Sequence, residues 1–531
     1  MSLPKTSSVR VSFFGIALAC FALIVFLWYI AGYFTSLLGH DQISYLFEAQ
    51  RMLSGVKLYG PHLAETNPPM IIWFSALPVL LANWMHGSAI FFMRLLITAM
   101  LLGSAFWCVR ILRRGTAITS PITVALFGVV LVAIELSIGP YDFGQREHIL
   151  FILLVPYVLA AAIGVLDRLS FAERCALGVA AGFAIWFKPQ DAVVLVVLEL
   201  FLVFRTRSFR RLRSPEFLAL ILTSSFILAL VPIFTPLYTR QTLPLLFDTY
   251  WALGAMTTLA LALSLHHYVF IVLGLLIVCI LLRRYQRDPA GSVALFLCSL
   301  AASFAYDIQH TQWTYHRYPH RSFLLLAIAY LVADLFDPLI HTLTAPPYLR
   351  WSRFAAGAIA AAILCVIAVH PHRYLSDPRG LKDVEVDQLF AQYQPSTTVY
   401  VFTTSVYPLA SAYNHGLNWG SRFAHLWMLP AIIQNELGPT GPPAPFKQLS
   451  PQRSAELAAL LRGEVTDDLN YWRPSVVLVD RCTIEQPCIG LEKKNFDAIP
   501  WFLQSPQFAE VWSHYKRQGD VDGYDVYRLT P

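Results

Sequence analysis

Long apolar runs alternate with short polar segments over the first 370 residues. The first run extends from Val11 to Phe34, follows Lys5 and Arg10, and has no small-residue cleavage site after it, which predicts a retained helix. About 20 apolar residues cross a bilayer core of about 30 Å. Later runs predict further spans at 89–112, 117–138, 148–166, 173–187, 190–204, 216–237, 261–282, 291–306, 322–340 and 354–370, which makes eleven in all.

The run from Met70 to Met85 is interrupted by Pro78 and is short for a span, so we predict that 69–86 lies on the outer face. With that choice, the basic clusters at 205–213 and 283–287 fall in cytoplasmic loops, as the positive-inside tendency requires. The N-terminus is then cytoplasmic and the first outer loop covers 35–88. The short spans 173–187 and 190–204 form a pair that meets at Lys188 near the outer face.

Residues 371–531 have a different, polar pattern. TVYVFTT (398–404), SVVLVD (475–480) and YDVYRL (524–529) predict strands, and 452–462 and 507–517 predict helices. The odd number of spans places this segment outside the membrane. We therefore predict a transmembrane domain, 1–370, and a small extracytoplasmic α/β domain, 371–531.

Composition agrees with a polytopic membrane protein. The chain is 56% hydrophobic and 14% charged, with a mean hydropathy of +0.54, whereas soluble domains carry about 25% charged residues. Up to residue 370 there are 25 Lys and Arg against 16 Asp and Glu, and from residue 371 there are 14 against 17. The positive charge therefore belongs to the membrane part, which argues against nucleic acid as a partner.

Cysteine positions separate the two parts of the chain. Six of the eight lie in or beside apolar runs, where buried packing is the simplest role. Cys482 and Cys488 are six residues apart in the polar part. If that part is extracytoplasmic, they are expected to form a small-loop disulfide.

Charged residues gather in the loops predicted to be outside. Asp41 follows the first span, and the 139–148 loop contains Asp142, Arg146 and Glu147. Lys188 lies between the two short spans, and the aromatic 307–321 loop contains histidines and arginines, among them His316 and Arg317. Because charged groups beside hydrocarbon are costly, their collection on one side favours a functional site.

Simpler interpretations exist for each group. Asp41 could cap the helix predicted at 42–53, Arg146 and Glu147 could form a local ion pair, and Lys188 could extend its amine to the membrane surface. The 307–321 loop could belong to an interfacial aromatic belt, and its spacing matches no structural zinc site. The cytoplasmic loops hold no comparable collection, which favours the interpretation as an active site.

The chemistry of these groups suits transfer from a lipid-linked sugar. A carboxylate at the membrane boundary can deprotonate an acceptor hydroxyl. A leaving polyprenyl phosphate needs cationic stabilisation, which Lys and Arg supply. The sequence contains no P-loop and no GxGxxG between a strand and a helix, which disfavours ATP-driven transport and cytoplasmic nucleotide-sugar chemistry.

Asp41, followed by Tyr45, Ala49, Gly55 and Tyr59 and then by NPPM (67–70) with Trp73, resembles the first outer loop of GT-C membrane glycosyltransferases. The similar groups are bacterial relatives of the dolichyl-phosphate-mannose protein mannosyltransferases, including the lipid A aminoarabinose transferase and the rhizobial galacturonosyltransferases. The resemblance covers 10–370 by layout and only the first outer loop by motif. It implies membrane-parallel helices in that loop, a periplasmic C-terminal domain and inverting transfer from a polyprenyl-phosphate sugar.

Carried over to this sequence, the resemblance assigns Asp41 as the general base. Asp142 and Glu147 fall where the family keeps a second acid, which would position hydroxyl groups or hold a divalent cation. Lys188 falls where related enzymes place a basic residue on the donor phosphate. We assign Arg146 to the same donor phosphate.

His316 and Arg317 are assigned to the same donor phosphate. The aminoarabinose transferase type has Lys before its Pro-Pro, where this chain has Asn67, so other cations must compensate. We assign four first-loop residues to substrate binding: Tyr45, Tyr59, Glu65 and Asn67. The C-terminal domain is expected to shape the acceptor site, with aromatic side chains of 407–427 stacking on sugar rings or simply packing in its core.

The function expected from the sequence is a glycosyltransferase of the bacterial inner membrane, surrounded by membrane lipid. Its co-substrate would be a lipid-linked sugar, and its acceptor a periplasmic glycan, lipid or protein. A flippase of lipid-linked saccharide is one alternative, although Glu135, Glu199 and Asp334 are scattered and no internal repeat is visible. A non-catalytic envelope assembly protein is another, and it leaves the outer charged residues without a role.

Overall fold

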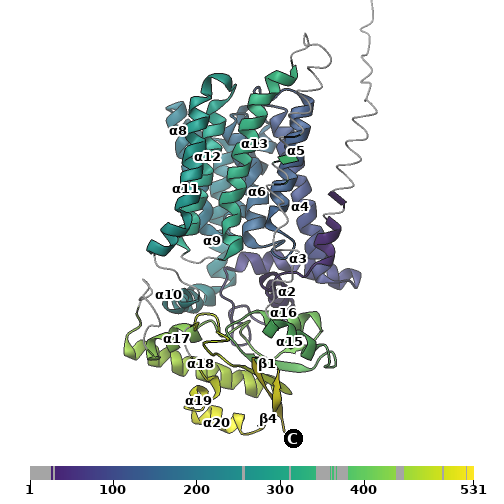
Figure 1. Ribbon diagram of the computed structural model, residues 1–531, viewed down its shortest axis with the longest axis vertical. Helices are drawn as coiled ribbons and strands as arrows, with labels where there is room; N and C mark the ends of the chain where they lie inside the picture. Colours follow the sequence, from purple (N-terminus) through teal and green to yellow (C-terminus); the bar gives the residue numbers. More distant parts are fainter. Residues whose placement is uncertain are drawn as a thin grey trace, which may run out of the picture.

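The computed structural model describes residues 26–27, 30–253, 258–309, 313–341, 359, 362–363, 366, 381–437, 448–492, 495–521 and 523–530. Most of the predicted spans at 354–370 and 11–34 and the predicted domain boundary at 370/371 lie outside these residues. Figure 1 shows two parts within them: a bundle of long helices, and an α/β unit stacked on one end of the bundle.

The bundle helices occupy the positions of the apolar runs. Five of them are long and apolar enough to cross a membrane: Ala89–Leu112, Pro121–Ile138, Pro215–Phe234, Pro289–Ile308 and Thr314–Pro338. The helices and their bounds are α4 (Ala89–Leu112), α5 (Pro121–Glu135), α6 (Arg146–Ala162), α7 (Phe171–Ala184), α8 (Ala192–Thr206), α9 (Pro215–Phe234), α11 (Thr258–Leu281), α12 (Pro289–Ile308) and α13 (Tyr318–His341).

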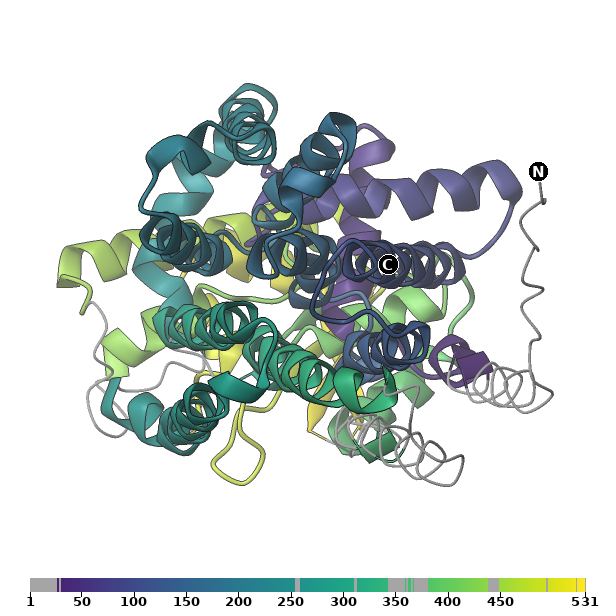
Figure 2. The ribbon, with the colours of Figure 1, turned by 90° about the horizontal axis from the view of Figure 1, so that it is seen from above.

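The first outer loop forms two helices at the junction of the two parts, α2 (His40–Leu53) and α3 (Pro69–Met85). Figure 1 shows α3 lying across the end of the bundle, and Figure 2 shows it running outward from the other helices. Its far end carries exposed apolar side chains, including Trp84 and Met85. This orientation agrees with the prediction that 69–86 lies along the outer face.

The short helices α7 and α8 meet at a 3-10 turn, Pro189–Asp191, as the sequence predicts. Glycines let α7 approach α9 closely. A Cβ atom at Gly178 would come within 2.1 Å of the carbonyl oxygen of Glu216, and one at Gly182 within 2.8 Å of that of Leu220. Small side chains at these positions therefore set the spacing of the two helices.

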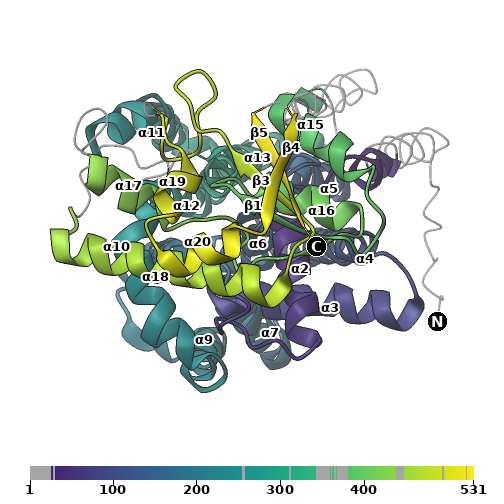
Figure 3. The same cartoon turned by 90° about the horizontal axis from the view of Figure 1, so that it is seen from below.

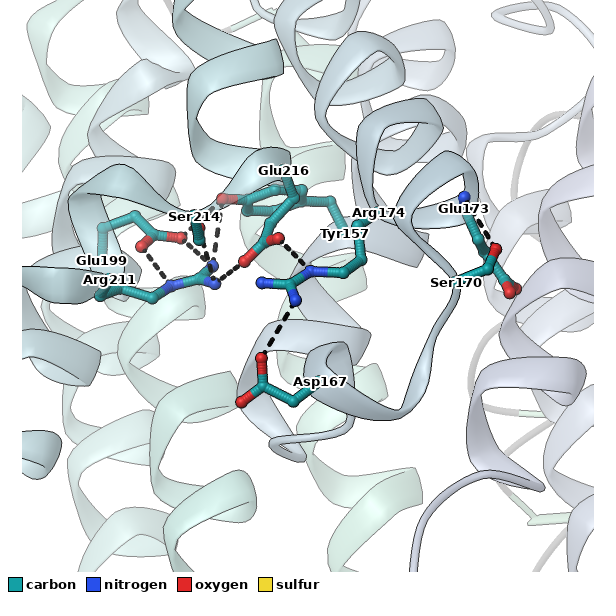
Figure 4. Close-up of polar contacts among 9 residues, drawn as sticks. All are labelled: Tyr157, Asp167, Ser170, Glu173, Arg174, Glu199, Arg211, Ser214 and Glu216. Carbon is teal, nitrogen blue, oxygen red and sulfur yellow. Dashed lines mark hydrogen bonds and ion pairs between the residues drawn. The ribbon is translucent and has the colours of Figure 1, made fainter.

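A buried ion network joins α6 to α9 near the end of the bundle away from the α/β unit (Figure 4). Arg211 forms ion pairs with Glu199, at 2.8 Å, and with Glu216. Arg174 also binds Glu216, at 2.6 Å, and the hydroxyl of Tyr157 donates to Glu199 at 2.7 Å. Because each buried carboxylate has a cationic partner, the network is a structural connection between four helices.

The C-terminal unit is a five-stranded mixed sheet of strand order β2-β1-β3-β5-β4. Strands β2, β1 and β3 are parallel to one another. Strand β5 runs antiparallel to both of its neighbours, β3 and β4. The strands are β1 (Thr398–Phe402), β2 (Asn418–Trp419), β3 (Val476–Asp480), β4 (Tyr515–Val521) and β5 (Tyr524–Leu529), and the helices are α15 (Leu381–Phe390), α16 (Tyr407–Asn414), α17 (Leu429–Leu437), α18 (Pro451–Trp472), α19 (Ala498–Phe502) and α20 (Pro506–Trp512).

The three predicted strands occur at β1, β3 and β5, but the prediction of a helix over 507–517 is wrong at its end. The helix α20 stops at Trp512, and Tyr515 begins strand β4. Most of the side chains of β4 are exposed, so this edge strand shows little of the apolar alternation by which strands are recognised. The helix predicted at 452–462 is instead twice that length, because its buried residues continue to Leu469.

Cys482 and Cys488 form a disulfide with an S–S distance of 2.01 Å, in the pairing expected from the sequence. The loop after it carries Gly490, whose carbonyl oxygen accepts a hydrogen bond from the amide of Gln434 at 2.6 Å. The same amide donates to the carbonyl oxygen of Ala252, which belongs to the bundle side. The disulfide loop is therefore part of the junction between the two parts.

The helix α2 of the first outer loop lies against the α/β unit (Figure 3), and hydrogen bonds connect the two. Arg51 of α2 donates to the carbonyl oxygens of Trp419 and Ser421, the latter at 2.7 Å, and to that of His62 at 3.2 Å. Ala64 pairs with the chain at 422–423 as an isolated β-bridge. The first outer loop thus has partners in both parts of the molecule.

We expect Arg51→Met to reduce the free energy of unfolding by about 2–4 kcal/mol, because several buried carbonyl groups would lose their donor. Thermal unfolding and limited proteolysis of the solubilised protein measure this, with Arg210→Met as the control because that side chain is exposed. A variant of unchanged thermal stability and protease resistance would contradict the structural role of Arg51.

Candidate active site

A cavity of about 230 Å³ lies where the bundle meets the α/β unit. The first outer loop, the 139–146 loop, the segments around 250 and 313–315, and three loops of the α/β unit all contribute to its wall. The lining residues are His40, Asp41, Ser44, Tyr45, Ala64, Glu65, Thr66, Asn67, Tyr141, Asp142, Arg146, Tyr250, Leu253, Trp313, Thr314, Tyr315, Thr404, Ser405, Val406, Tyr407, Ala424, His425, Trp427 and Ile489.

Asp41 lies in the first turn of α2, and its side chain does not cap that helix, whose N-cap is Gly39. Its carboxylate accepts a hydrogen bond from the amide of Gln145 at 2.8 Å and lies 3.2 Å from Nε2 of His40. Burial acts to raise the pKa of Asp41, but His40, Gln145 and Arg146 together hold it below its usual value. Asp41 is therefore ionised at neutral pH and available as a base.

The 139–145 loop is held tightly against the start of α2. The backbone N–H of Gly39 donates to the carbonyl oxygen of Tyr141 at 2.7 Å. A Cβ atom at position 39 would come within 2.7 Å of that oxygen, so a residue without a side chain is required. The hydroxyl of Tyr141 in turn contacts Nδ1 of His40 at 2.8 Å, which orients the imidazole beside Asp41.

Asp142 lines the same cavity and is buried, with 4% of its surface exposed. Burial, together with the negative charges of Asp41 and Glu147, raises the pKa of Asp142 to about 8. It is therefore protonated at neutral pH while Asp41 is ionised. Two neighbouring carboxyl groups with separated pKa values can take different roles, one as a base and one as a hydrogen-bond donor.

Arg146 is the first residue of α6 and lines the cavity. The phenol groups of Tyr45, Tyr250 and Tyr315 are its neighbours. Within the described residues it has no ion-pair partner, and its Nε atom, although buried, has no hydrogen-bond partner. The N-terminus of α6 also has no side-chain cap. An uncommitted guanidinium beside a helix N-terminus is an arrangement that binds anions.

Three other residues that the sequence predicts for the site, Glu147, Lys188 and His316, lie together but do not line the cavity. Lys188 forms an ion pair with Glu147 at 2.7 Å and also donates to Gln309. His316 lies 3.4 Å from the same Glu147 oxygen. Glu147 is thus paired with Lys188 and not with its neighbour Arg146, and Lys188 is buried instead of reaching toward the membrane surface.

The remaining predicted residues divide into two groups. Tyr45, Glu65 and Asn67 line the cavity. Tyr59 is buried outside its wall, and its hydroxyl donates to the carbonyl oxygen of Asn67, so it supports the loop. Arg317 is exposed, and its nearest polar contact is the hydroxyl of Tyr306 at 3.4 Å.

Several lining residues were not identified from the sequence. His40 directly precedes Asp41. Trp313 and Tyr315 belong to the 307–321 loop, from which only the charged and histidine side chains were assigned to the site. Thr404 ends the predicted strand 398–404. Because ligands often bind at the carboxyl ends of parallel strands, the sequence could have predicted this residue as part of the site. Tyr250 carried no signal, because only tertiary packing brings it to the cavity.

A group of possible metal ligands occurs at Asp480, Cys482 and Cys488, but both sulfur atoms belong to the disulfide. Among the described residues, no other group of three or more His, Cys, Asp or Glu side chains converges closely enough to hold an ion. The divalent cation expected near Asp142 or Glu147 therefore stays a prediction.

The structure defines a helical membrane protein with a polar cavity enclosed by an outer loop and a C-terminal α/β unit. No protein-family model matches the chain, and no curated protein sequence matches it.

Among solved structures, the chain is similar to ArnT from Cupriavidus metallidurans. The apo crystal structure is 14% identical in sequence, covers 97% of each chain and has a TM-score of 0.56. The structure bound to undecaprenyl phosphate is 15% identical, covers 97% of this chain and 98% of ArnT, and also has a TM-score of 0.56. At this identity the likeness shows the fold alone, a fold that this chain shares with ArnT.

The cryo-EM structure of the arabinofuranosyltransferase AftD from Mycobacteria is also similar, with 14% identity. It covers 99% of this chain and 40% of AftD, with a TM-score of 0.43. This likeness is too low to support an argument about the site.

Proposed function

We propose that this protein is a membrane glycosyltransferase that moves a sugar from a polyprenyl-phosphate donor to an acceptor hydroxyl, with inversion at the anomeric carbon. The observation that carries the proposal is the presence, in one cavity, of an ionised, half-buried carboxylate, Asp41, and a guanidinium without an ion-pair partner among the described residues, Arg146. The fold, which is shared with an ArnT structure bound to undecaprenyl phosphate, supports this choice of donor.

In this mechanism Asp41 accepts the proton of the acceptor hydroxyl as the hydroxyl oxygen attacks the anomeric carbon. The bond between that carbon and the phosphate oxygen breaks, and the polyprenyl phosphate leaves with the electron pair. Arg146 and the N-terminus of α6 stabilise the negative charge that develops on the phosphate. Asp142, protonated at neutral pH, donates a hydrogen bond to a substrate oxygen and adds no charge to the cavity.

Lys188 and His316 act indirectly in this proposal. By pairing with Glu147, Lys188 leaves Arg146 free to face the cavity. The donor phosphate contact expected from Lys188, His316 and Arg317 is therefore assigned to Arg146. The cavity and the α/β unit would face the periplasm of a bacterial inner membrane, with the N-terminus in the cytoplasm.

The flippase alternative is less well supported. A transporter needs ionisable groups that are free to change partners near the middle of the membrane. Glu199 is paired with Arg211, and Asp334 accepts two backbone hydrogen bonds, from Arg287 and Asp288, each at 3.1 Å. These two groups have fixed structural partners, whereas both carboxylate oxygens of the buried Glu135 have no hydrogen-bond partner within the described part of the chain.

Deletion of the gene, followed by profiling of envelope lipids and polysaccharides, tests the proposed function. Loss of one sugar from one acceptor, restored by the wild-type protein and not by Asp41→Asn, is the expected result. An unchanged sugar profile would contradict the proposal, and accumulation of lipid-linked saccharide on the inner leaflet would favour the flippase.

The rate of transfer is expected to follow a bell-shaped pH profile. It rises at acid pH as Asp41 loses its proton, because the pKa of Asp41 is held below its usual value. It falls as Asp142 ionises near pH 8, because a second negative charge then repels the donor phosphate. In Asp142→Asn the fall at high pH should disappear while the rise at low pH remains. A fall near pH 8 that persists in Asp142→Asn would contradict this assignment.

The same pKa difference affects stability. The folded protein binds a proton at Asp142 up to about pH 8, whereas the unfolded chain releases it near pH 4. Between these values the folded state holds more protons, so the free energy of unfolding falls as pH rises through this window. Asp142→Asn should remove that part of the pH dependence.

A further inference from the structure

The α/β unit supplies one wall of the cavity, termed here the C-terminal wall and formed by Thr404, Ser405, Tyr407, His425 and Trp427. Two loops build it. The first follows the carboxyl end of β1, and the second precedes α17. The backbone N–H of Leu426 donates to the carbonyl oxygen of Thr403 at 2.8 Å, so the two loops lie side by side as one surface.

This wall adjoins the proposed base. The ring of Tyr407 lies 4.5 Å from that of His40, centroid to centroid, and His40 contacts Asp41. The charge of Asp41 also acts on His425. A molecule held on the C-terminal wall would therefore lie beside the group that removes the acceptor proton.

Three polar atoms of the wall have no protein partner although they are buried: Oγ1 of Thr404, Nδ1 of His425 and Nε1 of Trp427. Thr404 is 2% exposed and Trp427 is 3% exposed. An unsatisfied buried donor or acceptor costs about 1–3 kcal/mol, and a ligand in the cavity can satisfy only those on its wall. Three on one cavity wall indicate a surface that is completed by a hydrogen-bonding ligand.

The wall is also neutral. It contains no Lys, Arg, Asp or Glu, and burial lowers the pKa of His425 to about 4, so the imidazole is uncharged at neutral pH. A phosphate group would find no cation here, and an amine would find no carboxylate. An acyl chain would leave all three polar atoms unpaired. Neutral hydroxyl groups on a ring that can stack on aromatic side chains fit both properties.

We propose that the C-terminal wall is a saccharide subsite, in which Thr404, His425 and Trp427 hydrogen-bond the hydroxyl groups of a neutral sugar ring on the acceptor. The acceptor is thereby a glycan or a glycosylated molecule, and its ring is held with a neighbouring hydroxyl directed at Asp41. The assignment of this sugar to the acceptor rests on the proposed function. The binding of a sugar by this wall does not, because it can be measured in the absence of transfer.

The test uses the full-length protein in lipid nanodiscs and methyl glycosides of common hexoses and pentoses as probes. Saturation-transfer difference NMR should detect binding of at least one neutral glycoside to the wild type. Trp427→Phe keeps an aromatic ring and removes the N–H group, and Thr404→Val keeps the side-chain shape and removes the hydroxyl. Each is expected to weaken binding about five- to tenfold, the effect of one hydrogen bond.

Matched controls lie outside the cavity. Trp472→Phe and Thr123→Val remove the same unpartnered groups from positions that do not line it, and should leave glycoside binding unchanged. The binding of undecaprenyl phosphate should be equal in wild type, Trp427→Phe and Thr404→Val, since the wall does not contact the donor phosphate.

Absence of glycoside binding to the wild type, or equal binding by wild type and both wall variants, would overturn the subsite. If glycosides bind through the wall but no sugar is ever transferred, the subsite stands and the proposed function fails. If transfer occurs with the same acceptor KM in wild type and both variants, the proposed function stands and the subsite fails.

Discussion

Asp41→Asn is expected to lower the rate of sugar transfer about 10²–10⁴-fold, the usual contribution of a general base. Asparagine keeps the size of the side chain and an oxygen that can accept the hydrogen bond from Gln145, so the fold should persist. It cannot accept the proton of the acceptor hydroxyl. Single-turnover transfer from a purified polyprenyl-phosphate sugar measures the effect directly.

Glu48→Gln is the matched control for this variant. Glu48 lies on the same helix, is buried and accepts a hydrogen bond from Ser44 at 2.8 Å, but does not line the cavity. Burial and the neighbouring Glu65 raise the pKa of Glu48 well above its usual value, so glutamine resembles its protonated form. A folded Asp41→Asn protein that transfers sugar as fast as Glu48→Gln would exclude Asp41 as the base.

Arg146→Met is expected to lower the rate of transfer about 10²–10³-fold, because it removes the one positive charge placed against the donor phosphate. Binding of undecaprenyl phosphate should weaken in parallel, and Arg146→Lys should recover only part of the loss, since an ammonium lacks the paired donors of a guanidinium. Binding is measured by fluorescence titration in nanodiscs, and transfer is measured separately.

Two other cations separate this assignment from the set expected from the sequence. Arg317→Met should leave donor binding unchanged, because Arg317 is exposed and outside the cavity. Lys188→Met should lower stability, since it leaves the buried Glu147 without its closest cation. If Arg317→Met weakened donor binding more than Arg146→Met, the phosphate would lie elsewhere.

The membrane part of the fold could be predicted closely because hydrophobic length is a direct physical requirement of a bilayer. The expected span at 89–112 has the bounds of α4, and the segment 69–86 forms a helix, α3, that lies across one end of the bundle. In the α/β unit the buried strands were recognisable from their apolar runs. The edge strand β4 was not, because its side chains are mostly exposed.

The site was predicted less completely, and the reason is tertiary. Asp41, Asp142 and Arg146 were singled out individually, and the cavity brings them together. The pairing of Lys188 with Glu147 joins residues from different helices, which local sequence does not encode. The contribution of Thr404 and Trp427 depends on how the α/β unit packs on the first outer loop, through contacts such as that of Arg51 with Ser421.

The contacts between the first outer loop and the α/β unit have a consequence for biosynthesis. The segment carrying Asp41 is translated long before the one carrying Thr404 and Trp427, so the nascent chain displays half of the cavity while the other half is still unmade. The cavity is complete only after the C-terminal part has been made and has packed on the first outer loop.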